Sequence, residues 1–97
     1  MRYAIHPEAD AEFAEAVAHY AAISPQLGRQ FFQEIEQLIR AVCAQPQRFY
    51  RLYPPARRAL SRKFPYSVVY VEQSDRVWIV AVMHAKRRPG YWKQRLA

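Results

Sequence analysis

Tyr66-Ser67-Val68-Val69-Tyr70-Val71-Glu72 and Val77-Trp78-Ile79-Val80-Ala81-Val82-Met83 are the two stretches that decide the fold. Both are rich in β-branched and aromatic residues, and only the polar residues 73–76 separate them. This pattern predicts a β-hairpin. Neither stretch alternates regularly between polar and apolar side chains, so we expect both faces of the strands to be buried. The hairpin should therefore form the centre of a sheet that helices cover on at least one side.

The residues before the hairpin predict one more strand of the same sheet. Residues 56–64 alternate weakly and are heavily basic, with Leu60 and Phe64 as the expected apolar anchors. Residues 45–55 contain three prolines and no helical pattern, so they are expected to form a loop. At the other end of the chain, residues 2–6 alternate and stop before Pro7, which predicts a short edge strand.

Two amphipathic helices are expected between the first strand and the loop. Pro7 suits the first turn of a helix, and the acidic residues after it favour the positive end of the helix dipole. Ser24-Pro25 is typical of an N-cap followed by proline, so a second helix should begin there and end near Ala44, before Pro46. Its apolar face consists of Leu27, Phe31, Ile35, Leu38, Ile39 and Val42. With almost no loop between them, the helices should pack as an antiparallel hairpin.

These elements predict a single α+β domain over residues 1–97. Its order is an N-terminal strand, an antiparallel helical hairpin and a three-stranded antiparallel meander (β-α-α-β-β-β). About fifty residues separate the first strand from the next one, so the first strand should join as an edge of a four-stranded sheet.

Positive charge is concentrated in the second half of the chain. Residues 1–48 hold four Lys/Arg against six Asp/Glu (4 − 6 = −2), and residues 49–97 hold eleven against two (11 − 2 = +9), which sum to the net charge of +7. The asymmetry predicts a cationic face for a polyanion or an acidic protein partner. The cationic residues concerned are Arg57, Arg58, Arg62, Lys63, Arg76, Lys86, Arg87, Arg88, Lys93 and Arg95.

Several classes of function are disfavoured by composition. The N-terminus lacks the apolar core of a signal peptide, and no stretch is apolar enough to span a bilayer, so we expect a cytoplasmic protein with no membrane partner. The single Cys43 fits a reducing compartment. The three histidines and the cysteine show no metal-ligand spacing, so neither a metal nor a cofactor is expected. Glu8, Glu12 and Glu15 share a helix face and are interpreted as a solvated surface.

The basic residues allow two interpretations. In the first, they bind phosphates while Tyr91 and Trp92 offer faces for base stacking, and a metal-free ribonuclease would use His84, Arg87 and Tyr91 for acid–base and electrostatic catalysis. In the second, they form a solvated or antagonist-binding face, and Tyr91 and Trp92 pack the tail onto the sheet. The residues alone favour the second interpretation.

The chain as a whole resembles the RelE/ParE superfamily of toxins from type II toxin–antitoxin systems, above all the ParE-like, plasmid-stabilisation branch. The resemblance covers nearly the entire sequence. The segments that carry it are Pro7-Glu8-Ala9-Asp10, the helix from Phe31 to Val42, Pro46, Lys63-Phe64-Pro65-Tyr66-Ser67-Val68-Val69-Tyr70 and Val82-Met83-His84-Ala85-Lys86-Arg87-Arg88-Pro89-Gly90-Tyr91-Trp92.

The resemblance implies a toxin that a cognate antitoxin neutralises by covering the helical hairpin and the sheet, and it leaves an oligomer with the antitoxin open. RelE-like members cleave mRNA on the ribosome, whereas ParE-like members inhibit DNA gyrase. Cleaving members typically carry an arginine where this chain has Pro65-Tyr66-Ser67-Val68, which is uncharged. The resemblance therefore favours a toxin that does not cleave RNA and is directed at gyrase, and whether the chain is an enzyme stays open.

Two alternatives stay open beside the gyrase inhibitor. A ribosome-dependent mRNA endoribonuclease would use His84, Arg87 and Tyr91 as its catalytic residues. A non-toxic relic would only bind the antitoxin. The residues expected to contact the target or nucleic acid are Arg57, Arg58, Arg62, Lys63, Lys86, Arg88, Trp92 and Lys93.

Overall fold

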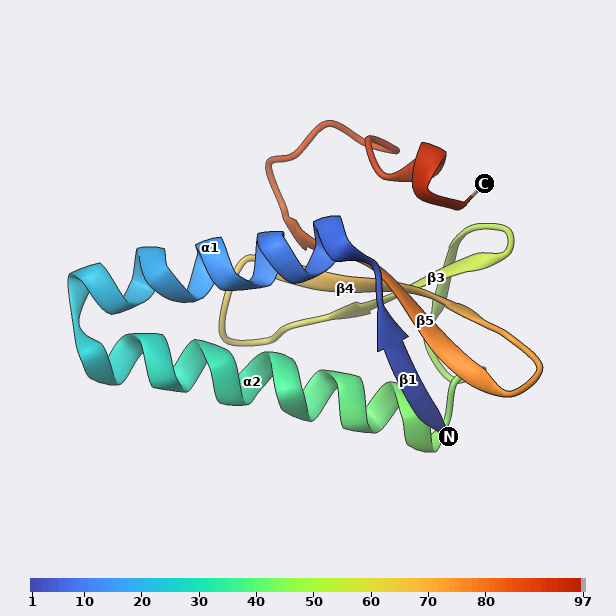
Figure 1. Ribbon diagram of the computed structural model, residues 1–97, viewed down its shortest axis with the longest axis horizontal. Helices are drawn as coiled ribbons and strands as arrows, with labels where there is room; N and C mark the ends of the chain where they lie inside the picture. Colours follow the sequence, from blue (N-terminus) through green and yellow to red (C-terminus); the bar gives the residue numbers. More distant parts are fainter. Residues whose placement is uncertain (97) are drawn as a thin grey trace.

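The fold is a five-stranded sheet (Figure 1). A helical hairpin covers one face of the sheet, and the segment after the last strand, residues 85–96, which we call the tail, covers the other. The computed structural model describes residues 1–96. The elements are β1 (Arg2–Ile5), α1 (Pro7–Ile23), α2 (Pro25–Ala44), β2 (Tyr50–Tyr53), β3 (Ala56–Leu60), β4 (Tyr66–Glu72), β5 (Arg76–His84) and the short 3₁₀ helix η1 (Lys93–Leu96).

The strand order is β1-β5-β4-β3-β2. As predicted, the hairpin of β4 and β5 is antiparallel and interior, and β1 joins as an edge, parallel to β5 with Ile5 opposite Ile79. The predicted four-strand count is wrong, because Tyr50–Tyr53 forms a fifth strand that pairs antiparallel with β3. The prolines of this region, Pro46 and Pro54-Pro55, lie outside the edge strand, where they do not disturb its pairing. Their number had indicated a loop over residues 45–55, and the strand was therefore not predicted.

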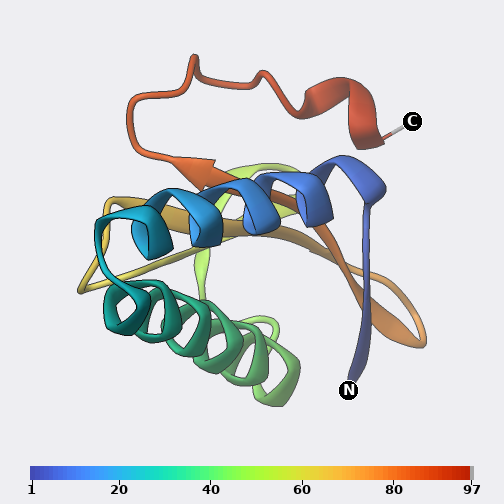
Figure 2. The same ribbon diagram turned by 60° about the vertical axis from the view of Figure 1, so that its left-hand side comes forward.

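The helical hairpin forms as the local sequence predicts (Figure 2). The Ser24 side chain caps α2 by accepting a hydrogen bond from the Leu27 N–H at 3.0 Å. The two helices approach closely where Gly28 of α2 meets α1, since a Cβ at Gly28 would lie 2.7 Å from the Cβ of Ala21. The lack of a side chain at Gly28 thus allows the close packing that sets the helices against each other.

The helix-side core lies between the hairpin and one face of the sheet. Its buried residues from the helices are Ala9, Ala16, Phe31, Ile35, Ile39 and Val42, and those from the sheet are Ala59, Val68, Tyr70, Val77, Ile79 and Val82. Some predicted apolar residues are less buried than expected. Leu27, Leu38 and Phe64 are only partly buried. Leu60 is 59% exposed, because alternation along β3 turns Ala59 toward the helices and Leu60 away.

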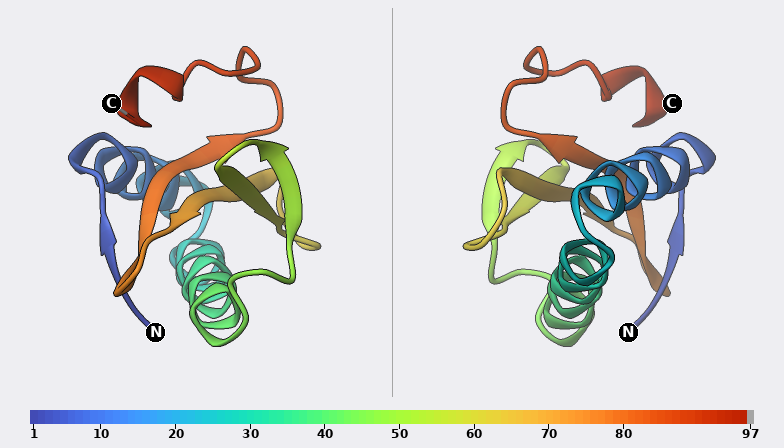
Figure 3. Two further views of the ribbon diagram at one scale, coloured as in Figure 1. Left: turned by 90° about the vertical axis from the view of Figure 1, so that its right-hand side faces the viewer. Right: turned by 90° about the vertical axis from the view of Figure 1, so that its left-hand side faces the viewer.

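A second, smaller core lies on the other face of the sheet, under the tail (Figure 3). A β-bulge makes this possible. Val69 of β4 lies opposite Ala81 and Tyr70 lies opposite Ile79, so no residue of β4 lies opposite Val80. Both Val80 and Ala81 therefore face the tail. Tyr91 and Trp92 pack onto them, and the short 3₁₀ helix η1 follows.

Candidate functional site

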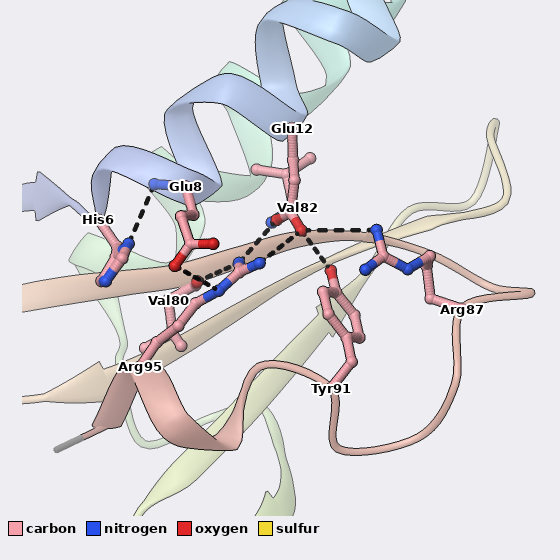
Figure 4. A network of polar contacts seen from close by, with 8 residues as sticks. All are labelled: His6, Glu8, Glu12, Val80, Val82, Arg87, Tyr91 and Arg95. Atoms are coloured by element: carbon pink, nitrogen blue, oxygen red, sulfur yellow. Dashed lines mark hydrogen bonds and ion pairs between the residues drawn. The ribbon is translucent and has the colours of Figure 1, made fainter.

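Glu12 of α1 is the centre of a polar network that joins the tail to the fold (Figure 4). The Tyr91 hydroxyl donates a hydrogen bond to its carboxylate at 2.8 Å, and both terminal nitrogens of Arg95 donate at 3.0 Å. The Val82 N–H donates at 3.1 Å, and a guanidinium nitrogen of Arg87 lies 3.8 Å away. One carboxylate thus holds three positions of the C-terminal segment.

The network forms where the edge of β5 loses its partner. Pairing with β1 ends at Ile79, so the backbone groups that follow need other partners. Glu12 accepts from the Val82 N–H, and Arg95 donates to the Val80 carbonyl at 3.1 Å. The Arg95 side chain is only 5% exposed, and its Nε lies 3.7 Å from Glu8 without a hydrogen bond. This geometry satisfies backbone groups and two opposite charges together, which a buried ion pair requires.

Two sequence-based interpretations are therefore wrong. Glu12 was expected on a solvated surface, yet its side chain is 14% exposed and fully engaged. Arg95 was counted with the cationic face, yet it is buried where the tail meets α1 and β5. A signal was present in the sequence, because Glu12 follows Ala9 by three residues and precedes Ala16 by four, which places it on the buried stripe of α1. A carboxylate on such a stripe indicates a buried cationic partner.

The surroundings of Tyr91 bear on its predicted role in catalysis. The residue is 8% exposed, and its hydroxyl is committed to Glu12. Burial and this hydrogen bond raise the pKa of Tyr91 well above the ordinary value for tyrosine. A phenol with such a pKa is a poor proton acceptor at neutral pH. Its position is that of a residue that anchors the tail.

Trp92 does not offer the stacking surface of the first, phosphate-binding interpretation. It packs the tail onto the sheet, as the favoured second interpretation expected. It is 1% exposed and packs in the second core, with the ring of Tyr53 at a centroid distance of 6.4 Å. Because the tail must cover the apolar face of the sheet, its largest side chain is turned inward. The expectation that Trp92 contacts nucleic acid bases is corrected accordingly.

Three of the predicted cationic residues come together in a groove between the β2–β3 hairpin and the tail, which we call the basic groove. It has a volume of about 280 Å³ and is lined by Arg58, Arg87 and Lys93, with Leu52, Met83 and Trp92 among its apolar residues. Arg58 comes from β3, and the other two follow β5. The two basic segments of the sequence therefore meet on one side of the molecule at these residues.

The other predicted cations lie outside the basic groove. Arg57 lies on the helix side of the sheet, because side chains alternate along β3, and it donates a hydrogen bond to the Phe49 carbonyl at 2.9 Å. Arg62 and Lys63 are exposed in the turn after β3. Lys86 and Arg88 are exposed in the segment after β5. The cationic surface is thus broad, with one defined depression.

A second depression, which we call the acidic cleft, lies on the other side of Arg87. It has a volume of about 290 Å³, and its lining includes Glu12, Glu15, His19 and His84. His84 packs against the Tyr66 ring, and its Nδ1 accepts the Lys86 N–H at 3.0 Å, which leaves Nε2 as the ring nitrogen with the proton when the imidazole is neutral. The predicted catalytic residues His84 and Arg87 therefore share a cleft with two carboxylates.

Two further features of residues 1–96 concern ligands and membranes. No three His, Cys, Asp or Glu side chains in this range are grouped as a metal ion would need. Neither α1 nor α2 combines the length and the hydropathy of a bilayer-crossing helix.

Comparison with known proteins identifies the family. Residues 3–89 match the family described as "ParE toxin of type II toxin-antitoxin system, parDE". The fold is similar to a solved structure of the chromosomal ParDE toxin–antitoxin system from P. aeruginosa, with a TM-score of 0.75 and 19% identity over 87% of this chain and 95% of that one. Among curated proteins, no sequence matches this chain. With the family match covering most of the sequence and the fold in agreement, the chain belongs to the ParE toxin family of type II toxin–antitoxin systems.

Proposed function

We propose that this chain arrests growth by binding and inhibiting DNA gyrase, and that a cognate antitoxin protein neutralises it in the cytoplasm. The observation that carries the choice of gyrase is the contact between Tyr91 and Glu12. It withdraws the tyrosine that a cleaving relative of this superfamily would be expected to use near the C-terminus. What is left on the surface is a set of cations suited to binding a large partner.

The central strand β4 supports the same proposal. Cleaving members of the superfamily typically carry an arginine in this region, as described above. Here Tyr66 and Val68 pack in or against the helix-side core, and Ser67 is 3% exposed. No cation therefore projects from the start of β4. The strand acts as part of the core, and binding falls to the surfaces around it.

The outer surface of the helical hairpin suits an antitoxin. A groove between the helices is lined by Val17, Ala21 and Phe32, and Phe32 is 42% exposed. Apolar helix grooves of this kind accept the apolar face of an amphipathic partner segment. The antitoxin would cover this surface and would also neutralise the positive charge of the C-terminal half.

A supercoiling assay with purified gyrase tests the proposal. We expect excess toxin to abolish supercoiling of relaxed plasmid, and Arg87→Ala to weaken that inhibition several-fold because an exposed cation at the surface is lost. Arg40→Ala removes an equal charge from an exposed site on α2 and serves as the matched control. Full supercoiling in the presence of excess wild-type toxin would rule out gyrase as the target.

Cleavage of mRNA on the ribosome is the second candidate, and one observation favours it. His84 and Arg87 line the same cleft, so an imidazole and a guanidinium are available together. The carboxylates of Glu12 and Glu15 in that cleft would repel an RNA phosphate, which weighs against the idea. Mapping mRNA 5′ ends after induction would reveal codon-positioned cuts if this candidate is right. Undiminished growth after induction without antitoxin would instead identify a non-toxic relic.

A further inference from the structure

The basic groove combines two properties that seldom occur together on a protein surface. Its rim carries three cations (Arg58, Arg87 and Lys93), and no carboxylate is among its lining residues. Its floor is apolar, with Leu52, Met83 and Trp92. The acidic cleft has a similar volume but contains two carboxylates. The basic groove is therefore the depression of the two that would attract an anionic ligand.

Aromatic rings hold the rim cations in place. The Lys93 ammonium lies 4.0 Å from the centroid of Tyr53, the Arg87 guanidinium 3.8 Å from that of Tyr91, and the Arg58 guanidinium 5.3 Å from that of Tyr50. These contacts restrain long side chains that would otherwise lose entropy on binding. They also place cations over the rings that a nucleic acid base would need for stacking.

We propose that the basic groove binds an acidic segment of a partner protein. An apolar side chain of that segment would occupy the floor, and carboxylates beside it would bind Arg58, Arg87 and Lys93. The inference rests on neutralisation by an antitoxin as proposed above, and it states where the antitoxin's acidic part binds and with what chemistry. Neutralisation would then combine apolar contact at the helical hairpin with carboxylate contact at the groove.

The floor of the groove favours a peptide over a nucleic acid strand. A phosphate backbone requires cations along its path but no apolar depression. A volume of about 280 Å³ is suited to one aliphatic or aromatic side chain. Within residues 1–96, the buried Trp92 Nε1–H has no hydrogen-bond acceptor, which is a costly arrangement. A small shift of the Trp92 side chain on binding would let a carbonyl or carboxylate oxygen of the peptide accept this hydrogen bond.

Fluorescence polarisation with the full-length toxin tests the inference. The probe is a labelled synthetic peptide in which one leucine is flanked on both sides by glutamates, and the control peptide has glutamine in place of every glutamate. We expect saturable binding of the acidic peptide, and about tenfold weaker binding to Arg58→Ala because a charge-assisted contact is lost. Arg40→Ala, which removes the same charge from an exposed site on α2, should bind within about twofold of wild type.

The site of binding can be read directly by NMR. In a titration of ¹⁵N-labelled toxin, the Trp92 indole and the Gly90 amide should shift, whereas the amides of α2 should not. Equal weakening by Arg58→Ala and Arg40→Ala would indicate general charge attraction and would overturn the proposal. Binding of a short DNA duplex in the groove without binding of the acidic peptide would overturn it as well.

The same samples separate this inference from the proposed function. A toxin that inhibits supercoiling but binds no acidic peptide would refute the groove proposal alone. A toxin that binds the peptide in the groove but leaves gyrase active would refute gyrase inhibition alone. Circular dichroism of both arginine variants should match wild type, since neither side chain is in a core.

Discussion

The two faces of the sheet are stabilised in different ways. The helix-side core contains twelve buried residues, and hydrophobic burial is enough to explain its packing. The core under the tail contains six buried residues, and the segment that covers it has only one short 3₁₀ helix. The tail stays in place because Glu12 binds Tyr91 and Arg95. The comparison teaches that a small apolar face can be closed by one polar anchor from a neighbouring helix.

The difference matters for function because the cations of the basic groove lie on the tail side of the sheet, which has the smaller core. Arg87 and Lys93 belong to the segment that the Glu12 network holds, and Arg58 faces that segment from β3. Changes that loosen the tail should therefore alter the basic groove while the helix-side core persists. Changes in the helix-side core should unfold the whole domain.

The largest effect is expected from Phe31→Ala. Phe31 is completely buried between α2 and the sheet and contacts the rings of Phe13, Tyr20, Phe64 and Tyr66. Its truncation should lower the free energy of unfolding by about 3–5 kcal/mol, as measured by urea denaturation. Phe32→Ala removes the neighbouring, exposed ring and should cost far less. Similar losses for both variants would contradict the assigned orientation of α2.

Glu12→Gln should have the next largest effect, confined to the tail side. The substitution leaves the buried Arg95 with only the exposed Glu8, 3.7 Å away, as a charged partner, and the loss of the charge-assisted hydrogen bonds should cost about 2–3 kcal/mol. Hydrogen exchange should show loss of protection in residues 91–96 and little change in α2. The control is Glu15→Gln, which replaces an exposed carboxylate three residues further along α1. It should leave the free energy of unfolding nearly unchanged. Equal loss of protection in both regions would refute the view that the two faces are independently stabilised.

Alkaline pH compares the two sides through one tyrosine on each. Burial raises the pKa of Tyr70, on the helix side, to about 12, and burial with the Glu12 hydrogen bond raises the pKa of Tyr91 as well. The folded state therefore keeps these protons when the unfolded chain has lost them, above pH about 10. Their stabilisation is complete below that pH and should decline by about 1.4 kcal/mol per pH unit for each tyrosine.

Phenylalanine variants isolate this contribution from other groups that titrate at high pH. Tyr70→Phe and Tyr91→Phe should each show a shallower decline of stability between pH about 10 and 12 than wild type. Each should also lose about 1 kcal/mol at neutral pH, because the hydroxyl of Tyr70 donates to the Pro46 carbonyl and that of Tyr91 donates to Glu12. Urea denaturation across this pH range makes the measurement. A decline as steep as that of wild type would contradict the raised pKa.

The smallest effect on stability is expected from Arg87→Ala. The side chain is 51% exposed and lies 3.8 Å from Glu12, so its loss should change the free energy of unfolding by about 0.5 kcal/mol or less. Growth arrest after induction should nevertheless weaken. Unfolding of this variant would show that the ion pair of Arg87 with Glu12 is structural and that Arg87 is not a target-binding residue.

The sequence alone predicted most of the framework. Helix boundaries followed from Ser24-Pro25 and Pro46, and the position of β4 and β5 followed from their apolar runs. Strand β2 was missed, because four residues between Pro46 and Pro54-Pro55 give no clear alternation. Among the candidate site residues, the grouping of Arg58 with Arg87 and Lys93 was within reach, since β3 and β5 flank the same strand, β4, in one sheet. The residues alone favoured packing of Trp92 onto the sheet but left it as a candidate target contact, and its burial in the fold decides for packing.

Local features follow from the amino-acid sequence: where helices begin and end, which strands are apolar, and the excess of positive charge after residue 48. Which charged residues are buried and which are exposed depends on how the chain folds. Glu12 and Arg95 are eighty-three residues apart, and they pair because the bulge and the end of β1 leave backbone groups that need partners. A side chain's pattern position fixes its face on an element, whereas its charge state and its role depend on what the folded chain places opposite it.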